Sequence, residues 1–291
     1  MTSFRSLIFV PAVNPRFVDK AKHLNADIVC FDLEDSVLPS EKVKARKMVQ
    51  HVLRQRTDYK LTKKVYVRIN SQQSGISQTD LRSAVRKGLD GIVVPKVNNK
   101  EELVKLIALI GELEGSRQIK KNSVKLMPTV ETAEGVVNAY SIAAADQRIE
   151  AIIFGVYDFL YDMGLDHVED DPAGYSYARM KIPVDARAAG VTAIDAIWQK
   201  VDDITGLRND AAKAKRLGYA GKSIIHPTQI QPVHEAFKPS NSEIEWATKV
   251  VRALGPGIRY GKGKGALRVE GKMIDAVHYK QAKAILENAS Q

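Results

Sequence analysis

The chain has 291 residues, 44% hydrophobic and 27% charged, a composition typical of a globular protein with one large domain or two small ones. Cys30 is the only cysteine, which excludes an internal disulfide and a cysteine-based zinc site; because it lies within an apolar run, we predict that it packs in the core. No apolar run approaches the roughly 20 residues that a membrane-spanning helix needs, and the first apolar segment is too short for a secretion signal. We therefore expect a soluble cytoplasmic protein.

The chain is basic, because 44 Lys and Arg residues against 34 Asp and Glu residues give a net charge of +10. Such a surplus attracts polyanions, of which nucleic acid and a phosphorylated cofactor such as coenzyme A are two candidates. The basic residues are scattered along the predicted helices, and no zinc-finger, RNA-recognition or helix-turn-helix signature is present. This distribution favours an ordinary solvated surface, and we expect neither a nucleic-acid partner nor a membrane.

Apolar, β-branched runs alternate with helical patterns along the chain. Eight runs predict strands, at 6–10, 27–31, 65–70, 91–96, 124–131, 150–155, 192–198 and 221–227. Each is followed by a predicted helix, near 15–24, 41–54, 80–87, 100–113, 135–145, 175–189, 205–217 and 242–254. Eight strand–helix units within about 250 residues predict a closed (β/α)₈ barrel. An open doubly wound sheet is the alternative, which the lack of a glycine fingerprint after the first strand disfavours.

A second segment follows the predicted barrel. Residues 253–268 are rich in Gly and Lys and predict a hinge, and a last helix is expected at about 275–289. We therefore divide the chain into a barrel domain, 1–254, and a C-terminal extension, 255–291. Docking of this helix on a neighbouring subunit and docking on its own barrel are both compatible with the sequence.

Polar residues stand at or just beyond the C-terminal ends of the predicted strands, where (β/α)₈ barrels carry their chemistry. They are Asp32, Glu34, Asp35, Arg68, Asn70, Lys96, Glu131, Asp158, Asp195 and His226. Any one of them could be an ordinary loop residue, but their convergence on one rim predicts a functional site.

Glu131 and Asp158 come from adjacent predicted strands, and two carboxylates without other strong ligands suit Mg²⁺. Arg68 emerges from an apolar strand and needs an anionic partner, which is either Asp32 or Glu34 in a structural ion pair or the carboxylate of a substrate. Lys96 offers a rival chemistry, since a lysine at a strand end can form a Schiff base with a carbonyl substrate in a metal-free aldolase.

Eight motifs occur in order along the chain: "RSLIFVPA", "FDLEDSV", "VYVRIN", "GIVVPKV", "PTVETAEG", "IIFGVYDF", "GKSIIHPTQI" and "EGKMID". In these motifs and their spacing the chain resembles the citrate lyase β-subunit-like family, within the HpcH/HpaI aldolase superfamily, which includes malyl-CoA, citramalyl-CoA and citryl-CoA lyases. The likeness extends from Arg5 to about Leu286.

The resemblance implies roles for individual residues. It implies that Glu131 and Asp158 bind Mg²⁺, that Arg68 holds the carboxylate of a 2-oxo acid, and that Glu34 and Asp35 contact metal-bound waters. We expect Asp32 to orient nearby cations.

Further positions follow from the same resemblance. Asp275 matches an aspartate that reaches a neighbouring subunit's site and handles the proton of the acetyl-CoA methyl group. Phe9 and Lys20 match positions along the coenzyme A path. The stretch "PAVNPRF" departs from the family's usual turn, and we expect Arg16 to take over a coenzyme A contact there.

The implied activity is Mg²⁺-dependent cleavage of a 3-hydroxyacyl-CoA that bears a carboxylate, or the reverse condensation, in a homotrimer or a dimer of trimers. Alternatives are the β subunit of a citrate lyase complex acting on carrier-bound acyl groups, and an acyl-CoA thioesterase. A more distant alternative is a nucleic-acid-binding or regulatory protein on an enzyme-like barrel.

Overall fold

The structure, a computed structural model, describes residues 4–59, 64–166, 173–260 and 266–289. It divides into two compact units, residues 1–234 and 235–291. The first unit contains the expected barrel. The expected boundary after residue 254 differs from this division, because the helix that was expected to complete the barrel belongs to the second unit.

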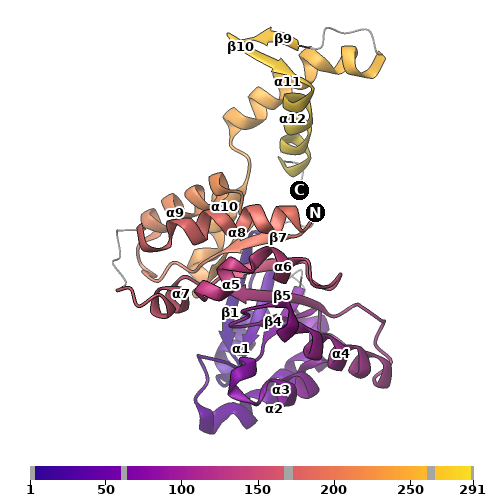
Figure 1. Ribbon diagram of the computed structural model, residues 1–291, viewed down its shortest axis with the longest axis vertical. Helices are drawn as coiled ribbons and strands as arrows, with labels where there is room; N and C mark the ends of the chain where they lie inside the picture. The colour runs from indigo at the N-terminus through magenta and orange to yellow at the C-terminus, as the bar shows by residue number, and fades with distance from the viewer. Residues whose placement is uncertain (1–3, 60–63, 167–172, 261–265, 290–291) are drawn as a thin grey trace. The chain divides into compact units, whose positions relative to one another are not determined.

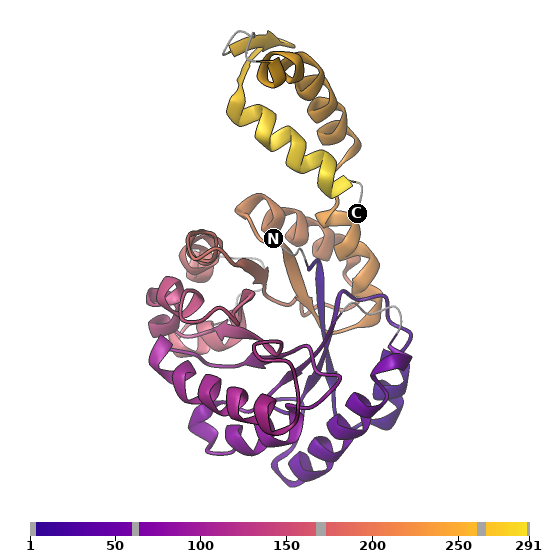
Figure 2. The same cartoon turned by 90° about the vertical axis from the view of Figure 1, so that its right-hand side faces the viewer.

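Eight parallel strands form a closed barrel in chain order, with β8 pairing back to β1 (Figures 1 and 2). They are β1 (Ser6–Pro11), β2 (Ile28–Asp32), β3 (Lys64–Arg68), β4 (Gly91–Val94), β5 (Lys125–Val130), β6 (Ala151–Phe154), β7 (Thr192–Asp195) and β8 (Gly221–Ile224). The predicted (β/α)₈ barrel is confirmed. From β3 onward the strands are shorter than the predicted runs, because several runs continue into the loops at the C-terminal end of the barrel.

Helices surround the strands (Figure 2). They are α1 (Pro15–Ala21), α2 (Lys42–Arg54), α3 (Ser77–Ala84), α4 (Lys100–Ser116), α5 (Ala133–Val137), α6 (Ala139–Ala143), α7 (Val156–Asp162), α8 (Ser176–Ala188), α9 (Ile204–Leu217) and α10 (Ile230–Phe237). The helix expected at 135–145 is two short helices joined at Asn138. The short helix α7 follows β6 directly and was not predicted, and it places Asp158 in its first turn.

The barrel interior is filled by apolar side chains from successive strands. Leu7, Cys30, Tyr66, Met127 and Ile153 belong to one buried cluster. Cys30 is fully buried, and burial raises the pKa of its thiol well above the usual range, so it packs as expected and does not react. This layer closes the barrel beneath the polar residues at the strand ends.

The β7–β8 seam has a short ladder, with two paired positions, and it carries a buried ionic tetrad. Arg179 of α8 forms two hydrogen bonds to Asp195, at 3.0 and 2.6 Å, and an ion pair of 2.8 Å to Asp210 of α9. Lys222 of β8 contacts the same two carboxylates, at 2.7 and 2.5 Å. Asp195 was expected at the functional rim, but both oxygens of its buried carboxylate are bound by Arg179 and Lys222 of this network.

The second unit consists of α11 (Asn241–Tyr260), a hairpin of β9 (Ala266–Val269) and β10 (Lys272–Asp275), and α12 (Ala276–Ala289). The expected hinge at 253–268 is wrong in its first part, because α11 continues through Gly255. Buried contacts of Val250 and Leu254 with Ile274 and Ala282 stabilise this end of the helix and outweigh the low helix propensity of glycine and proline. Residues 261–265 of the expected hinge lie outside the described residues.

The hairpin was not predicted. Its turn places Glu270 at φ 47° and Gly271 at φ 82°, and two consecutive positive φ angles are typical of the tight turns that join antiparallel strands. Asp275, expected as the first residue of the last helix, is the last residue of β10 and caps α12 instead.

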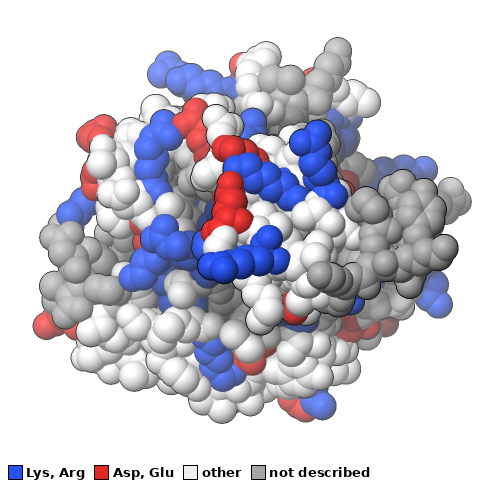
Figure 3. All heavy atoms as spheres, turned by 90° about the horizontal axis from the view of Figure 1, so that it is seen from above, with Lys and Arg blue, Asp and Glu red and all other residues white. Residues whose placement is uncertain are grey.

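Charge is mixed over the surface drawn in Figure 3, where Lys and Arg side chains alternate with Asp and Glu. This agrees with the scattered distribution of basic residues in the sequence. None of the helices in the described ranges combines the length and the apolar character needed to cross a bilayer.

The tetrad yields a stability prediction. Lys222→Met should lower the free energy of unfolding by about 3–5 kcal/mol, because it leaves Asp195 and Asp210 with Arg179 as their one shared cation in the tetrad and so leaves one negative charge uncompensated. Chemical denaturation monitored by circular dichroism measures the effect. The double variant Lys222→Met/Asp210→Asn removes one charge of each sign and should lose less than the single variant. An equal or larger loss would show that shape, and not charge balance, sets the role of Lys222.

Candidate active site

The C-terminal ends of β2 and β3 bring Asp32 and Arg68 together. The two residues are paired in the strand register, and Arg68 Nε and Nη2 each lie 2.7 Å from one oxygen of the Asp32 carboxylate. Asp32 has no exposed surface. It was expected to orient a nearby cation, and it does so. Asp32 is thus a structural ion-pair partner of Arg68, one of the two carboxylates that the sequence offered for this role.

Asp32 also fixes the loop that follows β2. Its carboxylate accepts hydrogen bonds from the backbone of Glu34 at 2.8 Å and from the backbone and hydroxyl of Ser36 at 3.1 and 2.5 Å. Burial opposes ionisation of Asp32, but the Arg68 guanidinium and these hydrogen bonds outweigh it and lower the pKa of the carboxyl. The Asp32 carboxylate therefore holds both the arginine and the acidic loop.

The guanidinium of Arg68 has one nitrogen that Asp32 does not use. Nη1 lies 3.1 Å from Glu34 Oε2 and 3.7 Å from Asp35 Oδ2, and the ring of Phe9 lies under the guanidinium at 4.6 Å. Burial favours the neutral form of Arg68, but Asp32 and the neighbouring carboxylates outweigh it and raise its pKa. Arg68 thus presents a fixed positive charge towards the acidic loop.

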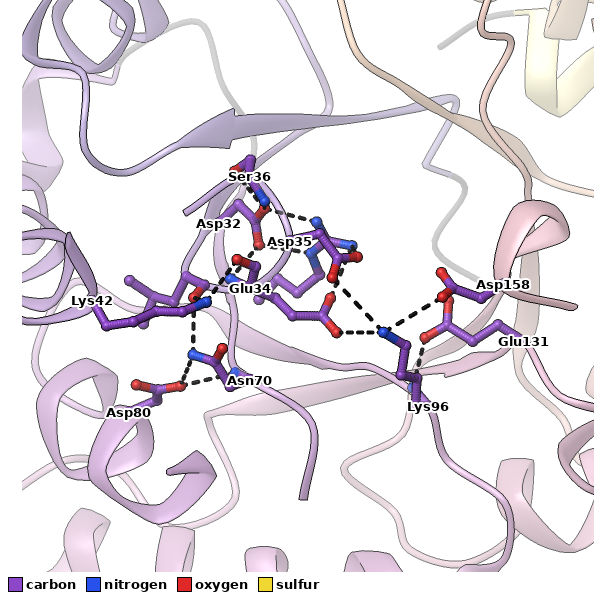
Figure 4. Close-up of polar contacts among 12 residues, drawn as sticks. Asp32, Glu34, Asp35, Ser36, Lys42, Asn70, Asp80, Lys96, Glu131 and Asp158 are labelled. Atoms are coloured by element: carbon purple, nitrogen blue, oxygen red, sulfur yellow. Dashed lines mark hydrogen bonds and ion pairs between the residues drawn. The ribbon is translucent and has the colours of Figure 1, made fainter. Parts of the chain in front are cut away.

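Lys96 is the second cation of the site. Its ammonium nitrogen lies 3.3 Å from Glu34 Oε1, 3.4 Å from Asp158 Oδ1 and 3.7 Å from Asp35 Oδ1 (Figure 4). Burial lowers its pKa, but the surrounding carboxylates outweigh that effect and the pKa is raised. A Schiff-base lysine must lose its proton to attack a carbonyl, so this environment opposes the metal-free aldolase chemistry.

The backbone of Lys96 positions Glu131. Lys96 has a φ of 53°, a left-handed conformation unusual for a lysine, and its backbone N–H donates to Glu131 Oε1 at 2.7 Å. Glu131 also packs against Gly155, where an added Cβ would lie 2.2 Å from Glu131 Oε2. Glycine is therefore required at position 155 for Glu131 to occupy this place.

Two carboxyl groups of the site have raised pKa values. Burial raises the pKa of Glu131 well above its usual range, and the charges of Asp158 and Glu34 add to the effect. Burial likewise raises the pKa of Glu34 to about 7, with Asp35 and Asp32 adding to the rise and Arg68 and Lys96 opposing it. An additional cation beside these groups would favour their ionised forms.

The donor chemistry fits a hard divalent cation. Glu34 Oε2 is a buried oxygen that forms an ion pair with Arg68 Nη1 at 3.1 Å but accepts no hydrogen bond among the described residues. Glu131 and Asp158 lie side by side next to Lys96 in Figure 4 and offer further oxygens. In the described ranges no group of three or more His, Cys, Asp or Glu side chains is placed to hold a metal ion. Two carboxylates completed by water or substrate oxygens are a typical Mg²⁺ arrangement.

Part of this site opens into a cavity of about 500 Å³. Its lining includes Phe9, Asp35, Arg68, Glu131 and Asp158. The cavity thus brings together one apolar surface, a fixed cation and the carboxylates that the sequence placed at the strand ends.

Other predicted residues lie outside this cavity. Arg16 and Lys20 are exposed on α1, one helical turn apart, so they share a face of that helix. His226 caps the turn after β8 through Thr228 and is exposed. Asp275 belongs to the second unit, where its Oδ1 lies 2.7 Å from His278 Nδ1 and accepts from the backbone of Val277 at 3.0 Å.

Lys42 and Asp80 support the site and were not predicted. Lys42 donates to the backbone carbonyls of Leu33 and Glu34 at 2.7 and 2.8 Å. Asp80 of α3 accepts from the backbone and side chain of Asn70, at 2.8 and 2.7 Å. Lys42 is one of many helical lysines, and nothing in the sequence distinguishes it.

Comparison with known proteins agrees with this geometry. Residues 5–227 match the HpcH/HpaI aldolase/citrate lyase family. The chain is 34% identical over 287 residues to the citrate lyase subunit beta of Haemophilus influenzae, covering 98% of this chain and 96% of that protein. It is 31% identical over 286 residues to a (3S)-malyl-CoA thioesterase of Cereibacter sphaeroides, covering 98% and 94%.

A solved structure is similar over the whole length. The CitE protein of Mycobacterium tuberculosis, in complex with magnesium, acetoacetate and coenzyme A, has a TM-score of 0.82 at 27% identity, covering 100% of this chain and 99% of that one. The resemblance read from the motifs is confirmed: the chain belongs to the HpcH/HpaI aldolase/citrate lyase family.

Proposed function

We propose that this protein is a Mg²⁺-dependent carbon–carbon lyase. Its substrate would be a 3-hydroxyacyl-CoA that bears a carboxylate, of the malyl-, citramalyl- or citryl-CoA type, cleaved to acetyl-CoA and a 2-oxo acid or formed by the reverse condensation. The observation that carries this proposal is the cavity that contains both the buried carboxyl group of Glu131, whose pKa is raised, and the guanidinium of Arg68.

We assign Glu131 and Asp158 as the residues that would hold Mg²⁺, with Glu34 and Asp35 accepting from metal-bound waters. When bound, the ion supplies Lewis-acid polarisation of the substrate's oxygens. The CitE protein with magnesium and coenzyme A supports the choice of ion and of thioester. Glu34 Oε2 is buried and accepts no hydrogen bond among the described residues, and its ion pair with Arg68 leaves it able to accept from a metal-bound water.

Arg68 would position the oxo-acid end of the substrate. Its Nη1 lies outside the Asp32 fork and forms ion pairs with Glu34 and Asp35, so a substrate carboxylate would bind there by taking the place of these two carboxylates. Because Asp32 and Phe9 hold the guanidinium on two sides, little side-chain freedom is lost on binding. Arg16 and Lys20 are exposed cations on α1 that we assign to the phosphates of coenzyme A.

Asp275 is the group we assign to proton transfer at the acetyl-CoA methyl carbon, supplied by a neighbouring subunit in a trimer or hexamer. Its Oδ1 is occupied by helix-capping contacts, and the His278 hydrogen bond lowers the pKa of the carboxyl. Oδ2 has no hydrogen-bond partner in the described part of the chain. An ionised carboxylate with one open oxygen suits a general base in the condensation direction and a proton donor in its protonated form.

A second candidate activity is hydrolysis of the thioester. The relatives named (3S)-malyl-CoA thioesterase, 31% identical over nearly the full chain, favour it. The relatives named citrate lyase subunit beta equally favour work on acyl groups carried by a protein partner.

A product analysis separates these activities. The protein is incubated with Mg²⁺ and, in turn, malyl-, citramalyl- and citryl-CoA, and products are followed by mass spectrometry. We expect acetyl-CoA and a 2-oxo acid from one substrate. Free CoA with an intact hydroxy acid would identify a thioesterase, and turnover of carrier-bound acyl groups alone would identify a complex subunit.

Lys96 and a divalent cation compete for the same carboxylates. In metal-free protein Lys96→Met should lower the melting temperature, because Glu34, Asp35 and Asp158 lose their shared ammonium group. Mg²⁺ should then bind more tightly than to wild type, because the competing positive charge beside the carboxylates has been removed. Calorimetric titration and thermal melting with EDTA or Mg²⁺ measure both effects.

Glu131→Gln tests the metal assignment. Glu101→Gln, the same substitution at an exposed position of α4, is its control. The first should abolish the Mg²⁺-dependent rise in melting temperature, and the second should leave it unchanged. An unaltered rise in the Glu131 variant would refute this ligand set.

Asp275→Asn tests the proton-transfer assignment. Asparagine retains the helix cap, so the melting temperature and the Mg²⁺-dependent binding of the 2-oxo acid should change little. Turnover should fall by about 10²–10⁴-fold, the usual contribution of a general acid or base. Steady-state kinetics beside calorimetry of oxo-acid binding provide the comparison, and wild-type turnover in the variant would remove Asp275 from the mechanism.

A further inference from the structure

A cationic cleft lies at the other end of the barrel. It is an open hollow of about 630 Å³ whose polar lining is Arg54, Arg56, Arg86, Lys87 and Arg117. These residues follow the C-terminal ends of α2, α3 and α4, on the loops that lead into β3, β4 and β5. The cleft therefore belongs to the N-terminal ends of the strands, opposite the cavity that holds Glu131.

A close backbone approach builds the cleft. Gly88 has a φ of 98°, and an added Cβ would lie 2.4 Å from the carbonyl oxygen of Leu53 and 3.1 Å from Arg56 Cβ. No other residue fits there without moving the end of α2. This contact brings the Arg86–Lys87 pair from the end of α3 against Arg54 and Arg56.

Backbone carbonyls fix two of the guanidinium groups. Arg117 donates from Nη2 to the carbonyl of Arg82 at 2.7 Å and from Nη1 to that of Val85, and Arg86 donates from Nε to the carbonyl of Ser83 at 2.7 Å. Arg56 is paired with Asp90 at 3.1 Å. Capping of the α3 C-terminus is therefore one role of this cluster, as expected for cations at a helix C-terminus.

Helix capping does not account for the remaining charge. Arg54 and Lys87 are exposed and have no hydrogen bond or ion pair among the described residues, and no carboxylate lines the cleft. The pKa of Arg86 is lowered by burial and by the neighbouring guanidinium groups of Arg117 and Arg54. On the face shown in Figure 3, by contrast, cations alternate with carboxylates.

We propose that this cleft binds a compact di- or triphosphate group, free or as part of a nucleotide. Guanidinium forks match phosphate oxygens in geometry, and the several charges of a polyphosphate balance several adjacent cations in a small volume. Leu53 and Gly88 complete the lining, which therefore contains no aromatic ring on which a base could stack. Recognition therefore falls on the phosphates and not on a base. This inference is independent of the proposed lyase activity.

Calorimetric titration with tripolyphosphate in a Mg²⁺-free buffer at about 0.15 M salt, where the Debye length is about 8 Å, is the direct test. We expect saturable binding of one ion per chain. AMP should bind at least tenfold more weakly than ATP, because the terminal phosphates make the contacts. Competition between ATP and tripolyphosphate for one site is expected.

The test variant is Arg54→Gln/Lys87→Gln, which removes the two exposed, unpaired cations and spares the carbonyl-capping arginines. Its matched control is Lys100→Gln/Lys105→Gln, which removes the same charge at exposed positions of α4, one at its first residue. The test pair should weaken tripolyphosphate binding at least tenfold, and the control pair by less than twofold. Equal weakening in both pairs would show non-specific attraction and overturn the proposal.

Hydrogen exchange with and without tripolyphosphate locates the site. Protection is expected at 53–56, 85–88 and 116–118. Protection confined to 32–36 and 129–131 would place the anion in the catalytic cavity and overturn the proposal, as would the lack of saturable binding. Tighter binding of a single-stranded oligonucleotide than of tripolyphosphate would also overturn it, in favour of a nucleic-acid surface.

Discussion

The fork between Asp32 and Arg68 is the interaction on which the C-terminal end of the barrel depends. Both oxygens of a fully buried carboxylate meet two guanidinium nitrogens at 2.7 Å, and the same carboxylate holds the backbone of the loop that follows. The fork leaves Arg68 Nη1 facing Glu34. Removing either partner would leave a buried charge unpaired, which typically costs about 3–5 kcal/mol. The acidic loop is therefore placed by a structural ion pair before any ligand binds.

The two ends of the barrel differ in charge, because the residues that follow strands and those that follow helices lie at opposite ends. Every strand runs in the same direction, so residues just after strands gather at one end and residues just after helices gather at the other. The first end collects carboxylates around Arg68 and Lys96. The second end collects Arg54, Arg86 and Arg117, because α2 ends in a basic residue and α3 and α4 have one within two residues of their ends. The barrel thus has an anionic cavity at one end and a cationic cleft at the other, although no long segment of the chain is itself acidic or basic.

The barrel and the ring of polar strand ends could be predicted from the sequence. Apolar runs mark the strands, and in a closed parallel barrel the residues that follow every strand lie at the same end. Asp32 was among the partners considered for Arg68 for the same reason. The conformation of Lys96 and the need for glycine at position 155 could not be predicted, since both depend on contacts with Glu131. The burial of Asp195 was missed because its partners come from other elements.

The two cations of the active cavity differ in what they can do. Arg68 is held by the Asp32 fork and by the ring of Phe9, so its charge is a fixed part of the fold. Lys96 makes only ion pairs of 3.3 to 3.7 Å, from a side chain that remains one-third exposed. A cation held this loosely can leave without unfolding the loop. The carboxylates thus have a permanent counter-charge on one side and an exchangeable one on the other, which would let a buried acidic site stay folded and still accept the metal ion that we propose for it.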